Sequence, residues 1–384
     1  MKRISLLGST GSIGKQTLEV VENLNYEIVA LTANTNVELL EMQVRKFKPE
    51  IVCIFNELYF KALKLRLADC FCKVVTKMEG LCEVARFKSA DLVFNAVVGT
   101  NGFLPTIVAF ESGKNVAMAN KEAIVVGGDI ILNCANKLGC KIIPVDSELS
   151  AIFQCVCGSD KNQISKLILT ASGGPFFCKN REYLKNVSVE QALNHPKWHM
   201  GSKISIDSAT MINKGFELIE ACYMFGKQAN DVEIVVHPQA VLHSAVLFDD
   251  GAVLGQFGVA DMKLPIQLAL TWPKRVKSIV EPFSFLKFKK LTFFEPDYET
   301  FGCLQICKNA FELGGFAPAI VHAANEQAVE LFLQGNLKFL QIEELIKMAV
   351  VQMKVINENY SVKSILTLIE EVKSFVLEKA KLLN

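Results

Sequence analysis

The sequence predicts an α/β protein with three parts: a Rossmann-like N-terminal domain, an α+β catalytic domain and a C-terminal helical bundle. Three observations support this prediction. Residues 1–145 alternate apolar, β-branched segments with segments of helical spacing, residues 146–276 mix glycine-rich pieces with a hairpin pattern, and residues 301–384 repeat apolar positions at helical spacing. Strand–helix alternation is typical of βαβ units around a parallel sheet. We expect residues 277–300, with Pro282 and Pro296, to form a linker.

The N-terminal part supplies strands and helices in turn. Right-handed crossovers between parallel strands would place the helices on both faces of the sheet. The expected strands are Arg3–Leu7, Glu27–Thr32, Ile51–Phe55, Leu92–Val98, Val116–Ala119 and Lys141–Val145, and the first expected helices are Ser12–Leu24 and Val37–Lys46.

Two elements stand out in the middle part. Asp207–Phe225 has the pattern of one long helix, with Asp207 as its N-cap. Residues 245–257 read as a β-hairpin, because Asp249-Asp250-Gly251 separates two strand-like segments. In the C-terminal part, two apolar stripes at helical spacing predict a small bundle: Ile342, Leu345, Ile346, Ala349, Val350 and Met353, then Ile365, Leu368, Ile369, Val372 and Val376.

Composition narrows the class of protein. The 384 residues are 51% hydrophobic and 21% charged, with a net charge of +1. This balance argues against a nucleic-acid partner held by general basicity. The sequence has no apolar run near the ~18 residues that a membrane span requires, so we expect a cytoplasmic protein. Its twelve cysteines include no C-x-x-C pair, which favours free thiols over a structural zinc site.

A glycine-rich loop follows the first expected strand. Gly8-Ser9-Thr10-Gly11-Ser12-Ile13-Gly14 joins that strand to the first helix. Glycines there allow a tight turn and a close approach to a pyrophosphate, which the amide groups at the start of the helix would bind. The loop predicts a dinucleotide site. The second expected strand ends at Asn34-Thr35-Asn36 without an acid, which favours NADP over NAD.

Carboxylates follow the expected strand Lys141–Val145. Asp146 and Glu148 lie two residues apart, so on an extended segment they would point the same way. Such a pair suits Mg²⁺ or Mn²⁺, which prefer oxygen ligands. A helix start, with Asp146 as N-cap and Glu148 in the first turn, explains the residues equally well.

Further polar residues gather on the expected helix Asp207–Phe225. Asn213, Lys214 and Glu217 would share one face, which fits either a phosphorylated substrate chelated to a metal or a solvated face with an ordinary ion pair. Asn120-Lys121-Glu122 follows another strand. The segment His195–Gly201, with Trp198, has the composition of a mobile lid that excludes water.

Taken together, these motifs resemble the 1-deoxy-D-xylulose 5-phosphate reductoisomerase family over essentially the whole chain. The resemblance is carried by Gly8–Gly14, Asn120–Glu122, Asp146–Glu148, Ser172–Phe176, His195–Gly201, Asp207–Glu217, His237–Gln239 and His243-Ser244. It implies an NADPH-dependent, divalent-metal-dependent homodimer of the non-mevalonate isoprenoid pathway. This enzyme would convert 1-deoxy-D-xylulose 5-phosphate to 2-C-methyl-D-erythritol 4-phosphate.

The resemblance also implies roles for individual residues. Metal ligands would be Asp146, Glu148 and Glu217. Substrate would contact Lys121, Ser147 and Glu148 at its carbonyl and hydroxyl end, and Ser172, His195, Ser208, Asn213 and Lys214 at its phosphate end. Glu217 would also contact it. NADPH would contact Thr10, Gly11, Ser12, Ile13, Asn36, Asn120, Glu122 and Gly201. The residues implied in catalysis are Lys121, Glu148, His195, Trp198 and His243.

Two other classes of protein remain to be separated from this one. A metal-independent Rossmann dehydrogenase would explain residues 1–145 but not Asp146, Glu148 and Glu217. A non-catalytic NADP-binding regulator would explain only the glycine loop. Loss of activity in EDTA would distinguish the reductoisomerase from the metal-independent dehydrogenase. Turnover of a sugar phosphate would exclude the non-catalytic regulator.

Overall fold

A computed structural model describes residues 2–160, 163–198, 200–353 and 360–383. The chain divides into two compact units. The first comprises Met1–Ala123, Asp129–Ser150 and Asp261–Glu281, and the second comprises Ile124–Gly128, Ala151–Ala260 and Pro282–Asn384. Residues 261–281, predicted from the sequence to lie in the middle domain and the linker, belong to the first unit, where α12 (Lys263–Thr271) packs against α1 (Ser12–Asn23).

The first unit is built on a parallel sheet of seven strands in the order β4-β3-β2-β1-β5-β6-β7. Strand β1 lies between β2 and β5, and its Ile4 and Leu6 are fully buried. This sheet confirms the parallel α/β fold expected from the alternating pattern. The strands are β1 Arg3–Leu7, β2 Glu27–Ala33, β3 Ile51–Ile54, β4 Lys73–Thr76, β5 Leu92–Asn95, β6 Asn115–Met118 and β7 Ile142–Pro144.

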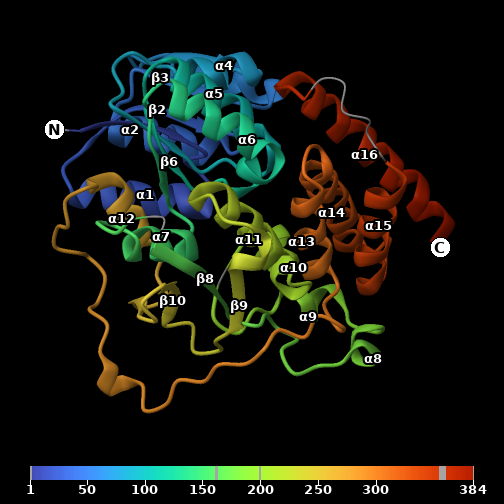
Figure 1. Cartoon of the computed structure of the whole chain (residues 1–384). Coiled ribbons are helices and arrows are strands. Elements are labelled where there is room, and N and C mark those ends of the chain that lie inside the picture. The colour runs from blue at the N-terminus through green and yellow to red at the C-terminus, as the bar shows by residue number, and fades with distance from the viewer. Residues whose placement is uncertain (1, 161–162, 199, 354–359, 384) are drawn as a thin grey trace. The chain divides into compact units, whose positions relative to one another are not determined.

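Helices connect these strands. Helix α4 (Lys77–Ala85) contacts β1, β2, β3 and β4. It packs beside α5 (Phe103–Glu111), as Figure 1 shows. The remaining helices of this part are α2 Val37–Phe47, α3 Phe60–Arg66, α6 Lys121–Lys137 and α7 Ser147–Cys155.

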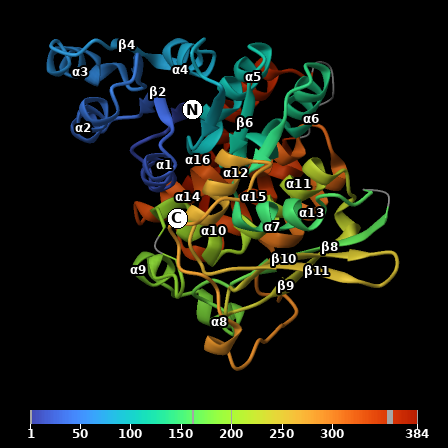
Figure 2. The same ribbon diagram turned by 90° about the vertical axis from the view of Figure 1, so that its left-hand side faces the viewer.

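The second unit contains a four-stranded sheet in the order β11-β10-β8-β9, whose strands lie side by side in Figure 2. Strands β10 and β11 are antiparallel, and the backbone N–H of Phe248 donates to the carbonyl of Ala252 across the turn. The expected hairpin is therefore confirmed. The strands are β8 Ile164–Ala171, β9 Val232–Val236, β10 Leu242–Phe248 and β11 Val253–Phe257.

The expected long helix Asp207–Phe225 is wrong as a single element. The structure has two helices, α10 Ser202–Ala209 and α11 Ile212–Phe225. Met211 separates them with a φ of 62°, in the left-handed region, where a right-handed helix cannot continue. Asp207 is consequently not an N-cap but a buried residue near the end of α10.

The C-terminal part is helical, as expected. Ile342, Leu345, Ile346 and Ala349 are buried on one helix, and Ile365, Leu368, Ile369, Val372 and Val376 are buried on the next. No helix among the described residues is both long enough and apolar enough to cross a membrane. The helices of the second unit also include α8 Arg181–Leu184, α9 Val189–Leu193, α13 Cys303–Leu313, α14 Ala317–Leu333, α15 Phe339–Gln352 and α16 Val362–Leu383.

Candidate active site

The glycine loop begins at the carboxyl end of β1. Gly8 has a φ of 84°, and its N–H donates to the hydroxyl of Thr32 at 2.8 Å. Helix α1 starts at Ser12, with Gly11 as its N-cap and no side chain capping it. Amide groups at such an uncapped helix start bind anions well. Thr10, Gly11, Ser12 and Ile13 therefore occupy the position expected of a pyrophosphate-binding loop.

Three other residues expected to contact a cofactor lie at the starts of helices. Asn36 caps α2 by accepting from the N–H of Leu39 at 3.0 Å. Asn120 caps α6, and its side-chain amide also donates to the carbonyl of Gly99 at 2.8 Å. Glu122 accepts from the N–H of Gly99 at 2.6 Å. Asn120 and Glu122 thus fix the loop that follows β5, at the same sheet edge as the glycine loop.

The carboxylates that follow β7 lie beside a lysine in the first unit. Lys121 forms an ion pair with Asp146, and both side chains are only 10% exposed. The hydroxyl of Ser147 donates to the carboxylate of Glu148 at 2.5 Å. Because α7 begins at Ser147, Asp146 precedes the helix and Glu148 lies in its first turn. This is the helix-start geometry left open by the sequence, and it still brings Lys121 and Asp146 together.

A second charged cluster lies on the first turns of α11. Glu217 is 1% exposed, and its carboxylate accepts from the amide of Asn213 at 2.6 Å and pairs with the ammonium of Lys214. The burial of this cluster excludes the solvated face that the sequence had left open. The break at Met211 sets the position of these residues, because α11 starts immediately after it.

Ser172 and His195 meet in the second unit, where the hydroxyl oxygen of Ser172 lies 3.0 Å from Nε2 of His195. Nδ1 of His195 accepts from the backbone N–H groups of Lys197 and Trp198, so in the neutral ring Nε2 carries the proton and donates to Ser172. Burial lowers the pKa of His195 to about 4. The imidazole is therefore neutral at physiological pH.

Three further expected residues of this unit lie in α10, at its start and in β10. Ser208 lies in α10 against the Ser172–Gly174 loop, because a Cβ added at Gly174 would be 2.6 Å from the carbonyl oxygen of Ser208. Gly201 is the N-cap of α10. His243, in β10, is 8% exposed, and its Nε2 lies 3.2 Å from the carbonyl of Val259.

Three acidic residues of the described chain form a group that could hold a metal ion: Asp146, Glu148 and Glu217. All three offer carboxylate oxygen, the ligand type that Mg²⁺ and Mn²⁺ prefer. The donor set therefore fits a hard divalent cation and not zinc in a structural site, which commonly takes cysteine and histidine.

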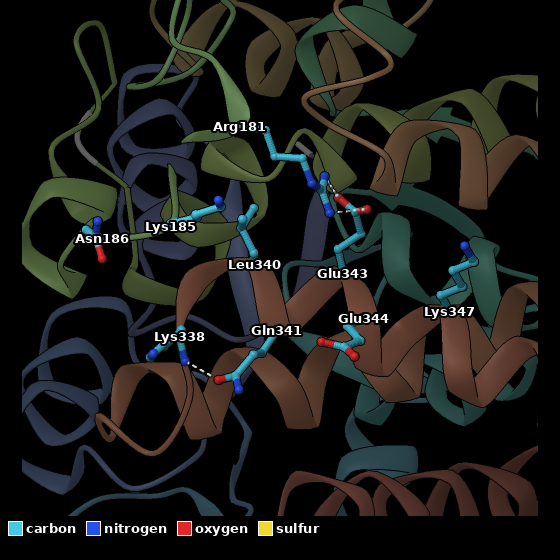
Figure 3. Close-up of a pocket in the computed structure, with 9 residues that line it drawn as sticks. All are labelled: Arg181, Lys185, Asn186, Lys338, Leu340, Gln341, Glu343, Glu344 and Lys347. Atoms are coloured by element: carbon cyan, nitrogen blue, oxygen red, sulfur yellow. Dashed lines mark hydrogen bonds and ion pairs between the residues drawn. The ribbon is translucent and has the colours of Figure 1, made fainter. Parts of the chain in front are cut away.

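A separate cavity of about 440 Å³ lies between α8 and α15 and is drawn in Figure 3. The guanidinium of Arg181 and the carboxylate of Glu343 point toward one another there and form two hydrogen bonds of 3.0 Å. None of the expected site residues lines this cavity, so it is not the candidate active site. Its lining is Arg181, Lys185, Asn186, Lys338, Leu340, Gln341, Glu343, Glu344 and Lys347.

Residues that support the site were missed from the sequence. The hydroxyl of Ser9 donates to the side-chain oxygen of Gln43 at 2.6 Å, and the amide of Gln43 donates back to the carbonyl of Ser9 at 3.0 Å. This buried pair holds the glycine loop against α2. No sequence pattern identified it, because the two residues lie 34 positions apart.

These features define a class of protein: a dinucleotide-dependent enzyme with a parallel-sheet domain and a carboxylate metal site. Family models agree and cover most of the chain. The model described as 1-deoxy-D-xylulose 5-phosphate reductoisomerase matches residues 4–128, the model of its C-terminal domain matches residues 142–225, and a further model of the DXP reductoisomerase C-terminal domain matches residues 257–375. The chain belongs to the 1-deoxy-D-xylulose 5-phosphate reductoisomerase family.

Individual relatives extend over the whole chain. The reductoisomerase of Clostridium perfringens is 46% identical over 383 residues, covering 99% of this chain and all of the relative. That of Ruminiclostridium cellulolyticum is 48% identical over 346 residues, covering 90% and 91%. The family and the fold class expected from the sequence are confirmed.

Two solved structures are closely similar. One, a DOX-P reductoisomerase in complex with NADPH, fosmidomycin and magnesium, has a TM-score of 0.95 at 38% identity, with 100% of this chain and 99% of that chain covered. The other, the Zymomonas mobilis enzyme in complex with NADPH, has a TM-score of 0.92 at 36% identity, with 99% of each chain covered.

Proposed function

We infer that this chain converts 1-deoxy-D-xylulose 5-phosphate to 2-C-methyl-D-erythritol 4-phosphate, a step of the non-mevalonate route to isoprenoid precursors. The observation that carries this function is full-length membership of the reductoisomerase family. The metal-independent dehydrogenase leaves the carboxylate group of Asp146, Glu148 and Glu217 without a role. A non-catalytic regulator likewise leaves the ion pair of Lys121 and Asp146 unexplained.

NADPH, which two related structures contain, is the proposed reductant and would supply a hydride. The uncapped start of α1 supports a role for Thr10, Gly11, Ser12 and Ile13 in binding its pyrophosphate. Asn36, Asn120, Glu122 and Gly201 complete the proposed cofactor site. The absence of an acid at Asn34-Thr35-Asn36 supports NADPH over NADH.

Asp146, Glu148 and Glu217 would hold the divalent cation, Mg²⁺ or Mn²⁺. A related structure contains magnesium, and the all-carboxylate donor set of this chain fits it. When bound, the cation polarises a substrate carbonyl as a Lewis acid. Lys121 forms an ion pair with Asp146, which keeps its ammonium at this site. In addition to this ion pair, the ammonium would donate a hydrogen bond to an oxygen of the substrate. Ser147 and Glu148 complete the contacts at this end.

The phosphate end of the substrate is held by residues of the second unit. Lys214 offers the positive charge, and neutral donors come from Ser172, His195, Ser208 and Asn213. Nε2 of His195 lies 3.0 Å from the hydroxyl of Ser172, so on substrate binding both groups could exchange this mutual hydrogen bond for donation to one phosphate. The backbone N–H of Trp198 donates to Nδ1 of His195, and we propose that the Trp198 side chain excludes water from the site. His243 is the remaining residue proposed to act in catalysis.

The reductoisomerase is proposed to be a cytoplasmic homodimer. Strand β11 supports the dimer, because it is an edge of its sheet and its Val253 and Leu254 are 55% and 49% exposed. An exposed apolar edge strand is a ready pairing surface.

The function is tested by following NADPH oxidation with 1-deoxy-D-xylulose 5-phosphate, with and without Mg²⁺ or Mn²⁺. The wild type should turn over only with the metal. Glu217→Gln keeps the size and one oxygen but removes the charge, so we expect kcat to fall about 100-fold or more and the metal concentration for half-activity to rise. NADPH affinity should change less than about twofold, since the glycine loop is untouched.

Two results would each overturn one part of the assignment, the metal dependence or the place of Glu217 in the metal site. Turnover that persists in EDTA would favour the metal-independent dehydrogenase. Near-normal turnover and metal dependence in Glu217→Gln would remove Glu217 from the metal site while leaving the activity itself in place. Glu233→Gln, at a half-exposed surface position in β9, is the matched control and should match the wild type.

A further inference from the structure

Asp207 is a buried carboxylate, 2% exposed, near the end of α10. One of its oxygens accepts from the side-chain amide of Asn325 at 2.8 Å. The other pairs with the ammonium of Lys203 at 2.7 Å, one turn earlier on the same helix. Asn325 lies in α14 and is fully buried. A buried hydrogen bond thus joins α10 to α14, the helix of the C-terminal part that packs against α13, α15 and α16.

The position of this carboxylate is unfavourable for α10 itself. The last turn of a helix carries a partial negative charge, which disfavours an acidic side chain there. Lys203 already balances the charge within α10, so Asn325 is not needed for neutralisation. The hydrogen bond from Asn325 instead fixes the position of α10 along α14. A hydrogen bond to a buried charge holds two helices in one register, whereas an apolar contact does not.

The helix held in this way carries part of the proposed phosphate site. Ser208 follows Asp207 directly, and its carbonyl oxygen is packed against Gly174 so closely that a Cβ there would lie 2.6 Å away. Three residues later the chain turns at Met211 and begins α11, which carries Asn213 and Lys214. A shift of α10 would therefore move the Ser172–Gly174 loop and the start of α11 together.

We propose that Asn325, acting through Asp207, is a positioning residue that holds the phosphate-binding end of the active site in register. This inference rests on the proposed function, because it assumes that Ser172, Ser208, Asn213 and Lys214 hold the substrate phosphate. It gives the C-terminal bundle a role in substrate affinity that does not require any residue of the bundle to touch the substrate.

Asn325→Ala tests the proposal, with Gln327→Ala as its matched control. Gln327 lies on the same helix and is 9% exposed, but its amide donates to Glu330 of its own helix at 3.1 Å. For 1-deoxy-D-xylulose 5-phosphate, Asn325→Ala should raise KM about tenfold or more with a smaller change in kcat. With unphosphorylated 1-deoxy-D-xylulose, kcat/KM should stay within about twofold of the wild type. Gln327→Ala should change neither.

The reverse pattern overturns the proposal. An equal loss with both substrates, or an unchanged KM for the phosphorylated one, would mean that Asn325 has only a structural role. If Asn325→Ala does not fold, Asn325→Leu takes its place, since leucine has a similar volume and no hydrogen-bond donor. The binding of inorganic phosphate, measured by calorimetry, tests the positioning role of Asn325 separately from the proposed reductoisomerase activity. A wild type that does not turn over the sugar phosphate refutes the proposed function, whereas weaker phosphate binding in the variant still supports the positioning role.

Discussion

At the scale of single residues, two glycines of the Gly8–Gly14 loop have different surroundings. A Cβ added at Gly14 would lie 2.2 Å from the carbonyl oxygen of Gly8 and 2.6 Å from Cα of Ser9. The nearest atom to a Cβ at Gly11 would be 3.5 Å away, which is ordinary contact. Gly14 is therefore required for packing within the protein, whereas Gly11 has room for a methyl group until a cofactor is bound.

This difference predicts two separable phenotypes. Gly14→Ala should lower the free energy of unfolding by about 2–4 kcal/mol, because the backbone of the loop must move. Gly11→Ala should change stability by less than about 1 kcal/mol but weaken NADPH binding about tenfold or more, since the methyl group occupies the pyrophosphate position. Urea denaturation and fluorescence titration with NADPH measure the two effects. Equal effects of both substitutions on stability would contradict this account of the loop.

His195 predicts a pH dependence of stability. Burial lowers its pKa from 6.5 to about 4. Well above pH 6.5 the ring is neutral in both the folded and the unfolded chain and contributes no pH dependence. As the pH falls from 6.5 toward 4, the unfolded chain takes up the proton first, so the free energy of unfolding should decrease by at most about 1.4 kcal/mol per pH unit.

His195→Gln removes this titration and retains hydrogen-bonding capacity. Denaturation by urea at pH 7 and pH 5 should show a smaller loss of stability at low pH for the variant than for the wild type. If both proteins lose the same free energy between these pH values, the burial of a neutral His195 is not the cause.

At the scale of secondary-structure elements, regular patterns were predictable and interruptions were not. Strand β1 follows directly from its short apolar segment, and the hairpin of β10 and β11 follows from the Asp-Gly turn between two strand-like segments. The break between α10 and α11 does not, because the sequence Thr210-Met211-Ile212 contains neither glycine nor proline. Methionine takes the left-handed conformation there against its own preference, so only tertiary packing can impose the break.

Helix α11 also depends on one close contact with α13. A Cβ added at Gly215 would lie 2.5 Å from the sulfur and 2.6 Å from Cβ of Cys307. Gly215→Ala should therefore push the helices apart and lower the free energy of unfolding by about 1–3 kcal/mol. Because Lys214 and Glu217 lie on the same helix, turnover should fall as well.

Combining Gly215→Ala with Cys307→Gly in a double variant moves the small residue from α11 to α13. This variant tests whether the close contact causes the loss of stability. Cys307→Gly removes both opposing atoms at a cost of about 1 kcal/mol for glycine in a helix. The double variant should then be about as stable as Cys307→Gly alone, a non-additive result that urea denaturation can measure. Additive losses would place the effect of Gly215→Ala elsewhere.

At the scale of the whole molecule, local motifs predicted the residues of the candidate site. They did not predict the hydrogen bonds between distant elements that hold those residues in place. Asp146, Glu148 and Gly8–Gly14 follow strands, so the parallel sheet predicted from the sequence also predicted where they would lie. Asp207 and Asn325 are 118 residues apart, and their hydrogen bond depends on how α10 packs against α14. Asp207 opens the motif Asp207–Glu217, but Asn325 belongs to none of the motifs, and a buried polar pair of this kind emerges only from the tertiary structure.

The proposed homodimer gives the last prediction. Strand β11 ends its sheet, and Leu254 on it is 49% exposed. If a second copy covers this edge, Leu254→Lys would bury an unpaired charge, and the dissociation constant of the dimer should rise about tenfold or more. Phe71→Lys is the matched control, because Phe71 is fully exposed and belongs to the first unit, whereas β11 belongs to the second. Sedimentation velocity across a range of concentrations should show weaker association for Leu254→Lys only. A monomeric wild type would refute the dimer, and unchanged association in Leu254→Lys would place the interface elsewhere on the chain.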